Sequence, residues 1–218
     1  MQNSTLTFAA ALLSLAALPL SACNQACASE DGQTSEQEIY QLCAQCHGSD
    51  GLGRESVGAP AIAGLPAWYV DAQLYKFERG FRGTHPKDIT GMRMRPMALA
   101  LPGPEDMKTV AEYVSHLPKK KTKPTVVGGD PERGCVLFAP CVACHGPAGK
   151  GNAATKAPPL AGLQDWYLLT QLEHFRSGVR ARNPQDETGT QMKPFAEALD
   201  EQGTKDVVAY IATLPWYR

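Results

Sequence analysis

The sequence predicts an all-α fold made of two tandem domains. Adding 98 to a residue number in the first half of the chain reaches a matching residue in the second half over most of its length, which indicates duplicated domains. Apolar residues recur at helical spacing in each half, whereas no run of strand length alternates between apolar and polar residues. The 218 residues of the chain are enough for two small domains.

Composition excludes one class of partner. Hydrophobic residues make up 43% of the chain and charged residues 20%, as in an ordinary soluble globular protein. The formal net charge is −1, so the chain lacks the basic excess of a nucleic-acid-binding protein. We therefore expect no nucleic-acid partner. Composition does not indicate the function further, so the function is inferred from the motifs.

The first segment of the chain is typical of an export signal. Residues 8–20 form an apolar run that is too short to span a membrane as a helix. Two cleavage sites compete. A lipobox-like sequence would make Cys23 a lipidated first residue, whereas Ala26-Cys27-Ala28 would release a soluble protein. We expect residues 1–28 to be the export signal, and the protein to be periplasmic, either soluble or anchored to the membrane through Cys23.

Each half then carries three helical segments. The first opens on a start signal, Ser35 with Glu38 in one half and Asp130 with Pro131 in the other. The second carries an apolar stripe that a glycine ends, and the third carries apolar residues at i, i+3, i+4 and i+7. In the second segment, the stripe residues are Val70, Leu74 and Phe77 before Gly80 in the first half, and Leu168, Leu172 and Phe175 before Gly178 in the second half. In the third segment, they are Val110, Tyr113, Val114 and Leu117 in the first half, matched by Val207, Tyr210, Ile211 and Leu214 in the second half.

A linker separates the two halves. Residues 119–128 are rich in lysine, contain proline and glycine, and lack helical periodicity. The predicted domains are therefore residues 29–118, called the first domain below, and residues 129–218, called the second domain.

One pentapeptide occurs once in each domain. Residues 43–47 and 141–145 both have the form CxxCH, the attachment signature of c-type haem, because two thiols form thioethers and the imidazole binds the iron. Zinc would need four ligands and a thioredoxin-like dithiol a βαβ setting, and the sequence offers neither. The motif predicts two covalently bound haem c groups. Their attachment residues are Cys43, Cys46, Cys141 and Cys144, and their proximal iron ligands are His47 and His145.

The ligand on the far side of each iron is predicted from the repeat. The loop of residues 91–97 holds three candidates, Met92, Met94 and Met97, whereas the loop of residues 189–195 holds only Met192. The offset of 98 pairs Met94 with Met192, so these two thioethers are the predicted axial ligands, each 47 residues after its histidine. The alternative is that both methionines only fill the core, which is the usual role of a lone methionine.

Four other candidate ligands lack a counterpart. His85, His116 and His174 align with residues that are not histidine, so we expect them to be ordinary surface or helix residues. Cys135 aligns with Gln37, and we expect a buried helical thiol there rather than a ligand.

With these motifs, the chain resembles class I cytochrome c, and its tandem arrangement resembles the dihaem bacterial cytochrome c-four group. The match runs from Thr34 to Leu214 and includes CxxCHG, the Ala-Pro and Ala-Gly-Leu sequences, the methionine segment and the closing Tyr-x-x-x-Leu-Pro. The resemblance implies a small helical unit around each haem and two His/Met-ligated irons. It also implies that the carbonyls of Pro60 and Pro158 accept a hydrogen bond from the axial imidazoles, and it makes Trp68, Trp166, Arg82 and Arg180 candidates for propionate contacts, with packing or surface roles as the alternative.

The predicted function is one-electron transfer, without enzymatic activity. The resemblance implies a periplasmic carrier that passes electrons between respiratory partners, toward a terminal oxidase, with a quinol-oxidising complex as a further candidate partner. Two alternatives stay open. One is a dihaem redox enzyme, such as a thiosulfate dehydrogenase or a peroxidase, which needs an open or exchangeable iron position. The other is an electron-transfer subunit of a larger complex.

Overall fold

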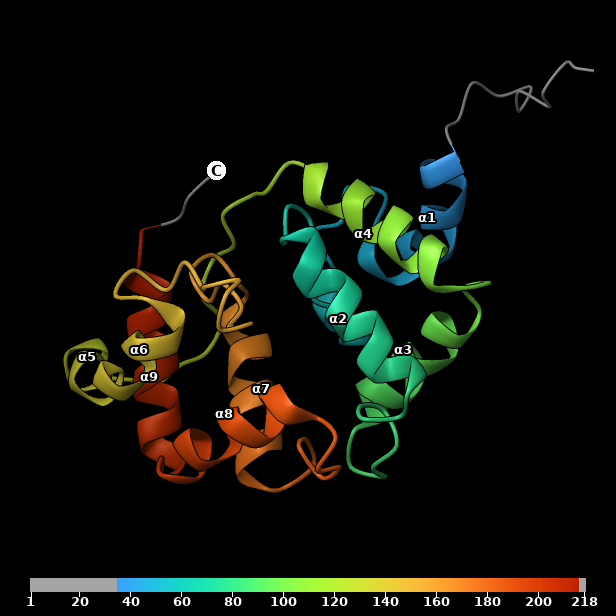
Figure 1. Cartoon of the computed structure of the whole chain (residues 1–218). Coiled ribbons are helices and arrows are strands. Elements are labelled where there is room, and N and C mark those ends of the chain that lie inside the picture. The colour runs from blue at the N-terminus through green and yellow to red at the C-terminus, as the bar shows by residue number, and fades with distance from the viewer. Residues whose placement is uncertain (1–34, 216–218) are drawn as a thin grey trace, which may run out of the picture. The chain divides into compact units, whose positions relative to one another are not determined.

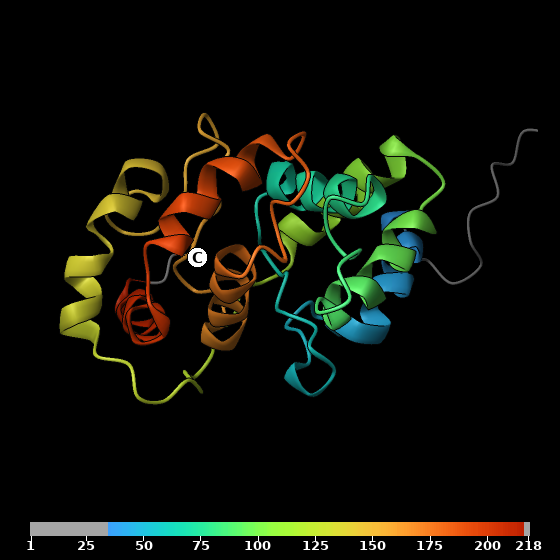
Figure 2. The same cartoon turned by 90° about the horizontal axis from the view of Figure 1, so that it is seen from below.

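The computed structural model describes residues 35–215, and this part of the chain is all-α, as predicted. Figures 1 and 2 show the helices of each half grouped together. The only β-structure within residues 35–215 is a pair of isolated bridges. None of the helices in this range has the length and apolar content needed to cross a membrane. The predicted export signal and the candidate anchor at Cys23 lie outside the described residues.

The two domains repeat the same order of helices. In the first domain these are α1 (Ser35–His47), the 3₁₀ helix η1 (Glu55–Val57), α2 (Ala67–Glu78), α3 (Ile89–Leu99) and α4 (Pro104–His116). In the second domain they are α5 (Pro131–Leu137), the 3₁₀ helix η2 (Ala139–Cys141), α6 (Val142–His145), α7 (Asp165–Arg176), α8 (Glu187–Glu197) and α9 (Glu201–Thr213).

The helix that delivers the CxxCH motif is continuous in the first domain and interrupted in the second. Helix α1 runs without a break to His47, whereas α5, η2 and α6 share the same path to His145. The offset of 98 places Pro140 where the first domain has Leu42. Proline lacks the N–H of a helical hydrogen bond and disfavours the helical conformation of the residue before it, so the break follows from this one substitution.

Aromatic pairs join the first and last helices of each domain. The ring centroids of Tyr40 and Tyr113 are 4.9 Å apart, and those of Phe138 and Tyr210 are 5.3 Å apart. The predicted apolar stripes are buried in the hydrophobic clusters of their domains, which confirms that the segments are helical and amphipathic. The buried stripe residues are Leu74, Phe77, Val110 and Val114 in the first domain and Leu168, Phe175, Val207 and Ile211 in the second.

The methionine segments are helical, so the prediction that they are loops is wrong. Residues 91–97 lie in α3 and residues 189–195 lie in α8, although each helix contains a proline. Both helices are stabilised at their first turn by an aspartate. The carboxylate of Asp88 accepts a hydrogen bond from the Gly91 N–H, and that of Asp186 accepts one from the Gly189 N–H. The cap fixes the start of the helix that carries Met94 or Met192.

The linker is hydrogen-bonded to the second domain at Asp165 and at Gln202, whose Nε2 donates to the carbonyl oxygen of Gly128 at 2.6 Å. The N–H groups of Thr125 and Val126 each donate a hydrogen bond of 2.6 Å to the same carboxylate oxygen of Asp165, the first residue of α7. Asp165 is buried, so its charge depends on these donors.

An Asp165→Ala substitution is expected to free the linker and to lower the free energy of unfolding by about 2 kcal/mol, because hydrogen bonds to a charged group contribute roughly that much. Limited trypsin digestion measures the first effect, since Lys119, Lys120 and Lys121 provide cleavage sites. Glu112→Ala, which removes an exposed carboxylate, is the control and is expected to leave the cleavage rate of the linker unchanged. Equal cleavage rates in the two variants would contradict the role of Asp165.

Candidate haem sites

The two CxxCH histidines are buried and oriented in the same way. The Nδ1–H of His47 donates to the carbonyl oxygen of Pro60 at 2.7 Å, and the Nδ1–H of His145 donates to that of Pro158 at 2.8 Å. A carbonyl oxygen only accepts, so Nδ1 carries the proton and Nε2 keeps its lone pair. Burial lowers the pKa of both imidazoles, although the proline carbonyls act in the opposite direction. Each ring is therefore neutral and fixed, the form that binds iron.

A short loop in each domain places the proline carbonyl against its histidine. Gly53 and Gly151 have φ values of 77° in the left-handed region, and each donates its N–H to the carbonyl oxygen of the histidine. A Cβ atom at either glycine would collide with the backbone of the proline. The loops close through the isolated bridges Arg54–Ala59 and Asn152–Ala157.

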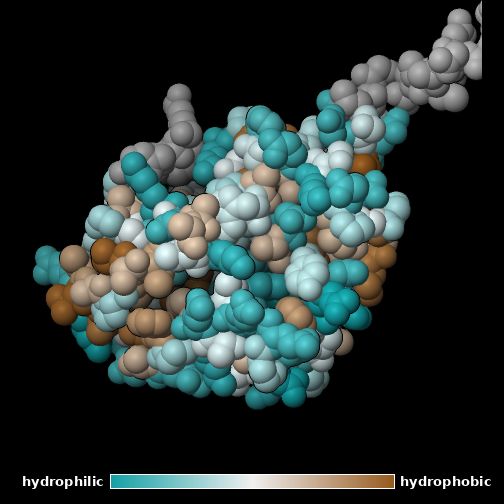
Figure 3. All heavy atoms as spheres, viewed as in Figure 1, coloured by the Kyte–Doolittle hydropathy of each residue, from teal (hydrophilic) through white to brown (hydrophobic). Residues whose placement is uncertain are grey.

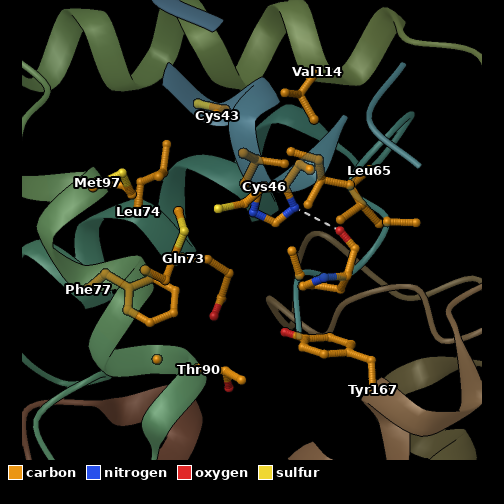
Figure 4. A pocket seen from close by; sticks show the side chains of 18 of the residues that line it. Cys43, Cys46, Leu65, Gln73, Leu74, Phe77, Thr90, Met97, Val114 and Tyr167 are labelled. Carbon is orange, nitrogen blue, oxygen red and sulfur yellow. Dashed lines mark hydrogen bonds between the residues drawn. The ribbon is translucent and has the colours of Figure 1, made fainter. Parts of the chain in front are cut away.

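Each domain has a cavity lined by its CxxCH motif. The first cavity has a volume of about 170 Å³ and is lined by both cysteines, by His47 and by apolar side chains of α2, α3 and α4. Figure 4 shows Cys46, Leu74 and Phe77 around this space, and Tyr167 of the second domain closing one side. The second cavity, of about 70 Å³, is lined by Cys141, Cys144 and His145 in the same way.

The attachment cysteines sit at the cavity walls. Cys43 and Cys141 are half-buried, whereas Cys46 and Cys144 are exposed. Burial raises the pKa of the Cys43 thiol to about 11 and also raises that of Cys141. Both thiols of each motif border one cavity, as covalent attachment of one haem requires.

The predicted axial methionines both line their cavities. Met94 of α3 and Met192 of α8 border the first and second cavity, respectively. Met97 also borders the first cavity, where Figure 4 shows it near Leu74, whereas Met92 does not border it and is 47% exposed. In the second cavity Phe195 stands at the position of Met97. The structure thus removes Met92 from the candidates, and the repeat favours Met94 over Met97.

Two buried arginines supply unpartnered donors. The Nη1 of Arg82 donates to Gln73 at 2.8 Å, and the Nη1 of Arg180 donates to Gln171 at 2.9 Å, while the Nε of each arginine has no partner among residues 35–215. Burial and the nearby Arg82 lower the pKa of Arg180 to about 10. A buried guanidinium with an unpartnered donor fits an anionic group such as a haem propionate, and Arg82 lines the first cavity. The residues present therefore fit a haem in each domain.

The candidate ligands without a counterpart lie in different surroundings. His174 is a residue of helix α7, in agreement with the expectation of a surface or helix residue, but it is only 15% exposed and its Nδ1 lies 3.8 Å from Asp88 of the other domain. Cys135 is exposed rather than buried. It lies on α5, where Val136 is 74% exposed and Figure 3 shows hydrophobic side chains at the surface. His116 is exposed, as predicted.

The sequence analysis missed the aspartates that cap α3 and α8. The offset of 98 pairs Asp88 with Asp186, and a glycine follows each of them after three residues. A Cβ atom at Gly91 or Gly189 would collide with the capping carboxylate. This repeated Asp-x-x-Gly spacing was a signal that could have predicted both caps.

Fixed imidazoles, paired thiols and a capped methionine helix at each cavity define a dihaem cytochrome of the c type. The family model described as cytochrome c matches residues 35–118 and 131–215. The chain therefore belongs to the cytochrome c family, with two such domains and two covalently bound haem c groups, and its general function is electron transfer.

Individual relatives carry more specific names. The chain is 35% identical to a thiosulfate dehydrogenase electron acceptor of Stutzerimonas stutzeri, over 79% of this chain and 78% of that protein. It is 39% identical to the Cbb3-type cytochrome c oxidase subunit CcoP of Rubrivivax gelatinosus over 65% of this chain, but it spans only 42% of that subunit. The crystal structure of reduced cytochrome c4 from Pseudomonas stutzeri matches with a TM-score of 0.63 and 27% identity, covering 83% of this chain and 97% of that one. This similarity confirms the predicted resemblance.

Proposed function

We propose that the chain is a periplasmic carrier that accepts single electrons from a thiosulfate-oxidising enzyme and delivers them toward a terminal oxidase. In this proposal, His47 and Met94 ligate one iron, and His145 and Met192 ligate the other. The observation that carries it is that each cavity is lined by one oriented histidine and by methionine on a capped helix, Met94 and Met97 in the first cavity and Met192 in the second. Two protein ligands leave no iron position for a substrate.

The chain's own residues set the properties of the two sites. Bound haem iron supplies the one-electron chemistry. The carbonyls of Pro60 and Pro158 orient the imidazoles and strengthen them as ligands. A methionine ligand raises the reduction potential relative to a second histidine, which suits delivery to a high-potential acceptor. The apolar walls of the cavities keep water away from the iron, which also affects the potential.

The relatives support the choice of donor and acceptor. The name of the Stutzerimonas stutzeri relative describes an electron acceptor of thiosulfate dehydrogenase. The name of the Rubrivivax gelatinosus relative describes a subunit of a terminal oxidase. A carrier related to both of these proteins is suited to pass electrons from a thiosulfate dehydrogenase to a terminal oxidase. The predicted export signal at residues 1–28 supports a periplasmic location, where covalent haem attachment takes place.

Stopped-flow reduction of the oxidised holoprotein tests this function. We expect both haems to be reduced when thiosulfate and a thiosulfate dehydrogenase are added together, and neither to be reduced rapidly by thiosulfate alone. Membranes that contain a cbb3-type oxidase are then expected to reoxidise them. Catalytic oxidation of thiosulfate by the holoprotein itself would contradict a carrier and favour the enzyme alternative.

A further inference from the structure

One side chain of each domain contacts the residue that caps the methionine helix of the other domain. Lys76 of α2 lies 2.6 Å from the carboxylate of Asp186, the residue that caps α8. His174 of α7 lies 3.8 Å from the carboxylate of Asp88, the residue that caps α3. The offset of 98 pairs Lys76 with His174 and Asp88 with Asp186, so these are the same contact in the two halves. The repeat therefore places a basic side chain of each domain at the start of the other domain's methionine helix.

The Lys76 contact extends to the second haem cavity. The Nζ atom of Lys76 also donates a hydrogen bond of 2.6 Å to the hydroxyl oxygen of Thr188, a residue in the first turn of α8. Thr188 lines the second cavity together with Met192 and His145. The side chain of Lys76 is only 12% exposed and that of Asp186 is fully buried, so solvent screens this charge weakly. A fixed cation of the first domain is thus one hydrogen bond away from the wall of the second cavity.

His174 differs from Lys76 in its protonation state. His174 faces Asp88, Arg82, Arg180 and His85. Burial is the largest influence and lowers the pKa of His174, Asp88 is the next and raises it, and Arg180, Arg82 and His85 each lower it, so that the net direction is downward. Its Nδ1 has no hydrogen-bond partner within the described residues. His174 is therefore neutral at pH 7 and becomes a cation only below its ordinary pKa of about 6.5.

We propose that Lys76 is a positioning residue for the second haem, although it belongs to the first domain, and that His174 acts in the same way on the first haem only when it is protonated. This inference rests on the proposed ligands Met94 and Met192. A cation beside a haem cavity disfavours the oxidised, more positive iron and so raises the reduction potential. The capping carboxylate that it neutralises also sets the position of the methionine helix. The two haems therefore respond differently to pH.

The first test is a redox titration of the Lys76→Met holoprotein, followed optically. The two haems are assigned beforehand from the spectra of the Met94→Ala and Met192→Ala variants. We expect the second haem to become harder to reduce, with its ratio of reduced to oxidised form falling at least tenfold at a fixed applied potential, which corresponds to about 59 mV for one electron. The first haem is expected to change less, although Lys76 lies in its own domain.

Matched variants separate this effect from a general loss of structure. Lys76→Arg keeps the charge and is expected to keep the potential of the second haem. Lys108→Met removes an exposed lysine of the same domain, one that pairs only with the exposed Glu105, and is expected to change neither haem. A larger shift in the first haem than in the second after Lys76→Met would overturn the cross-domain role. If instead Met192→Ala left both haem spectra unchanged, the proposed ligands would be wrong, which is a different failure.

The second test follows both potentials between pH 8 and pH 5. As the pH falls below 6.5, we expect the potential of the first haem to rise in the wild-type protein, and this rise to be smaller in His174→Gln. In His174→Lys, the potential of the first haem is expected to be raised already at pH 8. His116→Gln is the control, because His116 is exposed and lies on the last helix of its domain. Identical pH profiles in the wild type and in both His174 variants would overturn the role of His174.

Discussion

Replacing Met192 with alanine is expected to remove the sulfur ligand from one of the two haems and to leave the other unchanged. The absorption band of the iron–methionine bond should fall to about half, and the affected haem should become high-spin or take up an exogenous ligand. The physical reason is that Met192 is the only methionine among the residues that line the second cavity, where Phe195 takes the place that Met97 has in the first.

The first domain provides the matched controls. Met94→Ala should remove the other half of the band, whereas Met92→Leu should leave it intact, because Met92 is exposed and does not line the cavity. Met97→Phe makes the first cavity resemble the second and should also leave the band intact. If Met94→Ala kept the full band and Met97→Phe lost half of it, the ligand of the first haem would be Met97. The offset of 98 would then not identify the ligand.

The repeat predicted the parts of the molecule that depend on local sequence. The CxxCH motif specifies the thiols and the imidazole directly, and the offset reduced three methionines to one. The apolar stripes follow from helical periodicity alone, and Val110 and Val114 are buried as expected. The helix predictions are confirmed because helical periodicity depends on residues that lie close together in the sequence. The ligand assignments rest on residues that are copied in both halves, and they stay predictions.

The missed features depend on competing local rules. Residues 91–97 and 189–195 were expected to be loops, and each segment contains a proline, which removes a helical hydrogen bond, yet the aspartate caps start a helix in both places. In the second domain, Pro140 interrupts the helix that is continuous in the first. The same residue type thus breaks one helix and is tolerated in two others, so proline alone does not predict the outcome.

Other features depend on how the two domains pack, which no single repeat encodes. His174 was expected to be an ordinary surface or helix residue, because its counterpart Lys76 is not a histidine. Packing against the first domain buries it beside Asp88. Gln164 likewise accepts a hydrogen bond from the Ala61 N–H of the other domain at 2.7 Å. A sequence analysis that treats each repeat alone cannot predict such contacts.

The Arg82→Gln substitution is expected to lower the potential of the first haem, in the proposed assignment, by about 59 mV or more, a tenfold change in the one-electron equilibrium. Arg82 lines the first cavity, is buried, and stacks on Phe77 with its guanidinium carbon 4.3 Å from the ring centroid. Its Nη2 also donates to Gln171 of the second domain at 3.1 Å. Removing this buried positive charge favours the oxidised iron, because an unscreened cation no longer opposes it. Redox titration of the holoprotein measures the change.

Two further variants separate the charge of Arg82 from its shape. Arg82→Lys keeps the charge but loses the planar guanidinium that binds Gln73 and Gln171 together. The reduction potential of the first haem should therefore fall much less than in Arg82→Gln, while the melting temperature of the protein falls. Arg79→Gln removes an exposed arginine at the C-terminal end of α2, three residues before Arg82, and should change neither property. An equal fall in potential for Arg82→Lys and Arg82→Gln would show that the geometry of the guanidinium, rather than its charge, controls the first haem. An equal fall for Arg79→Gln would show that any cation near this helix has the same effect, and the buried position of Arg82 would then have no special role.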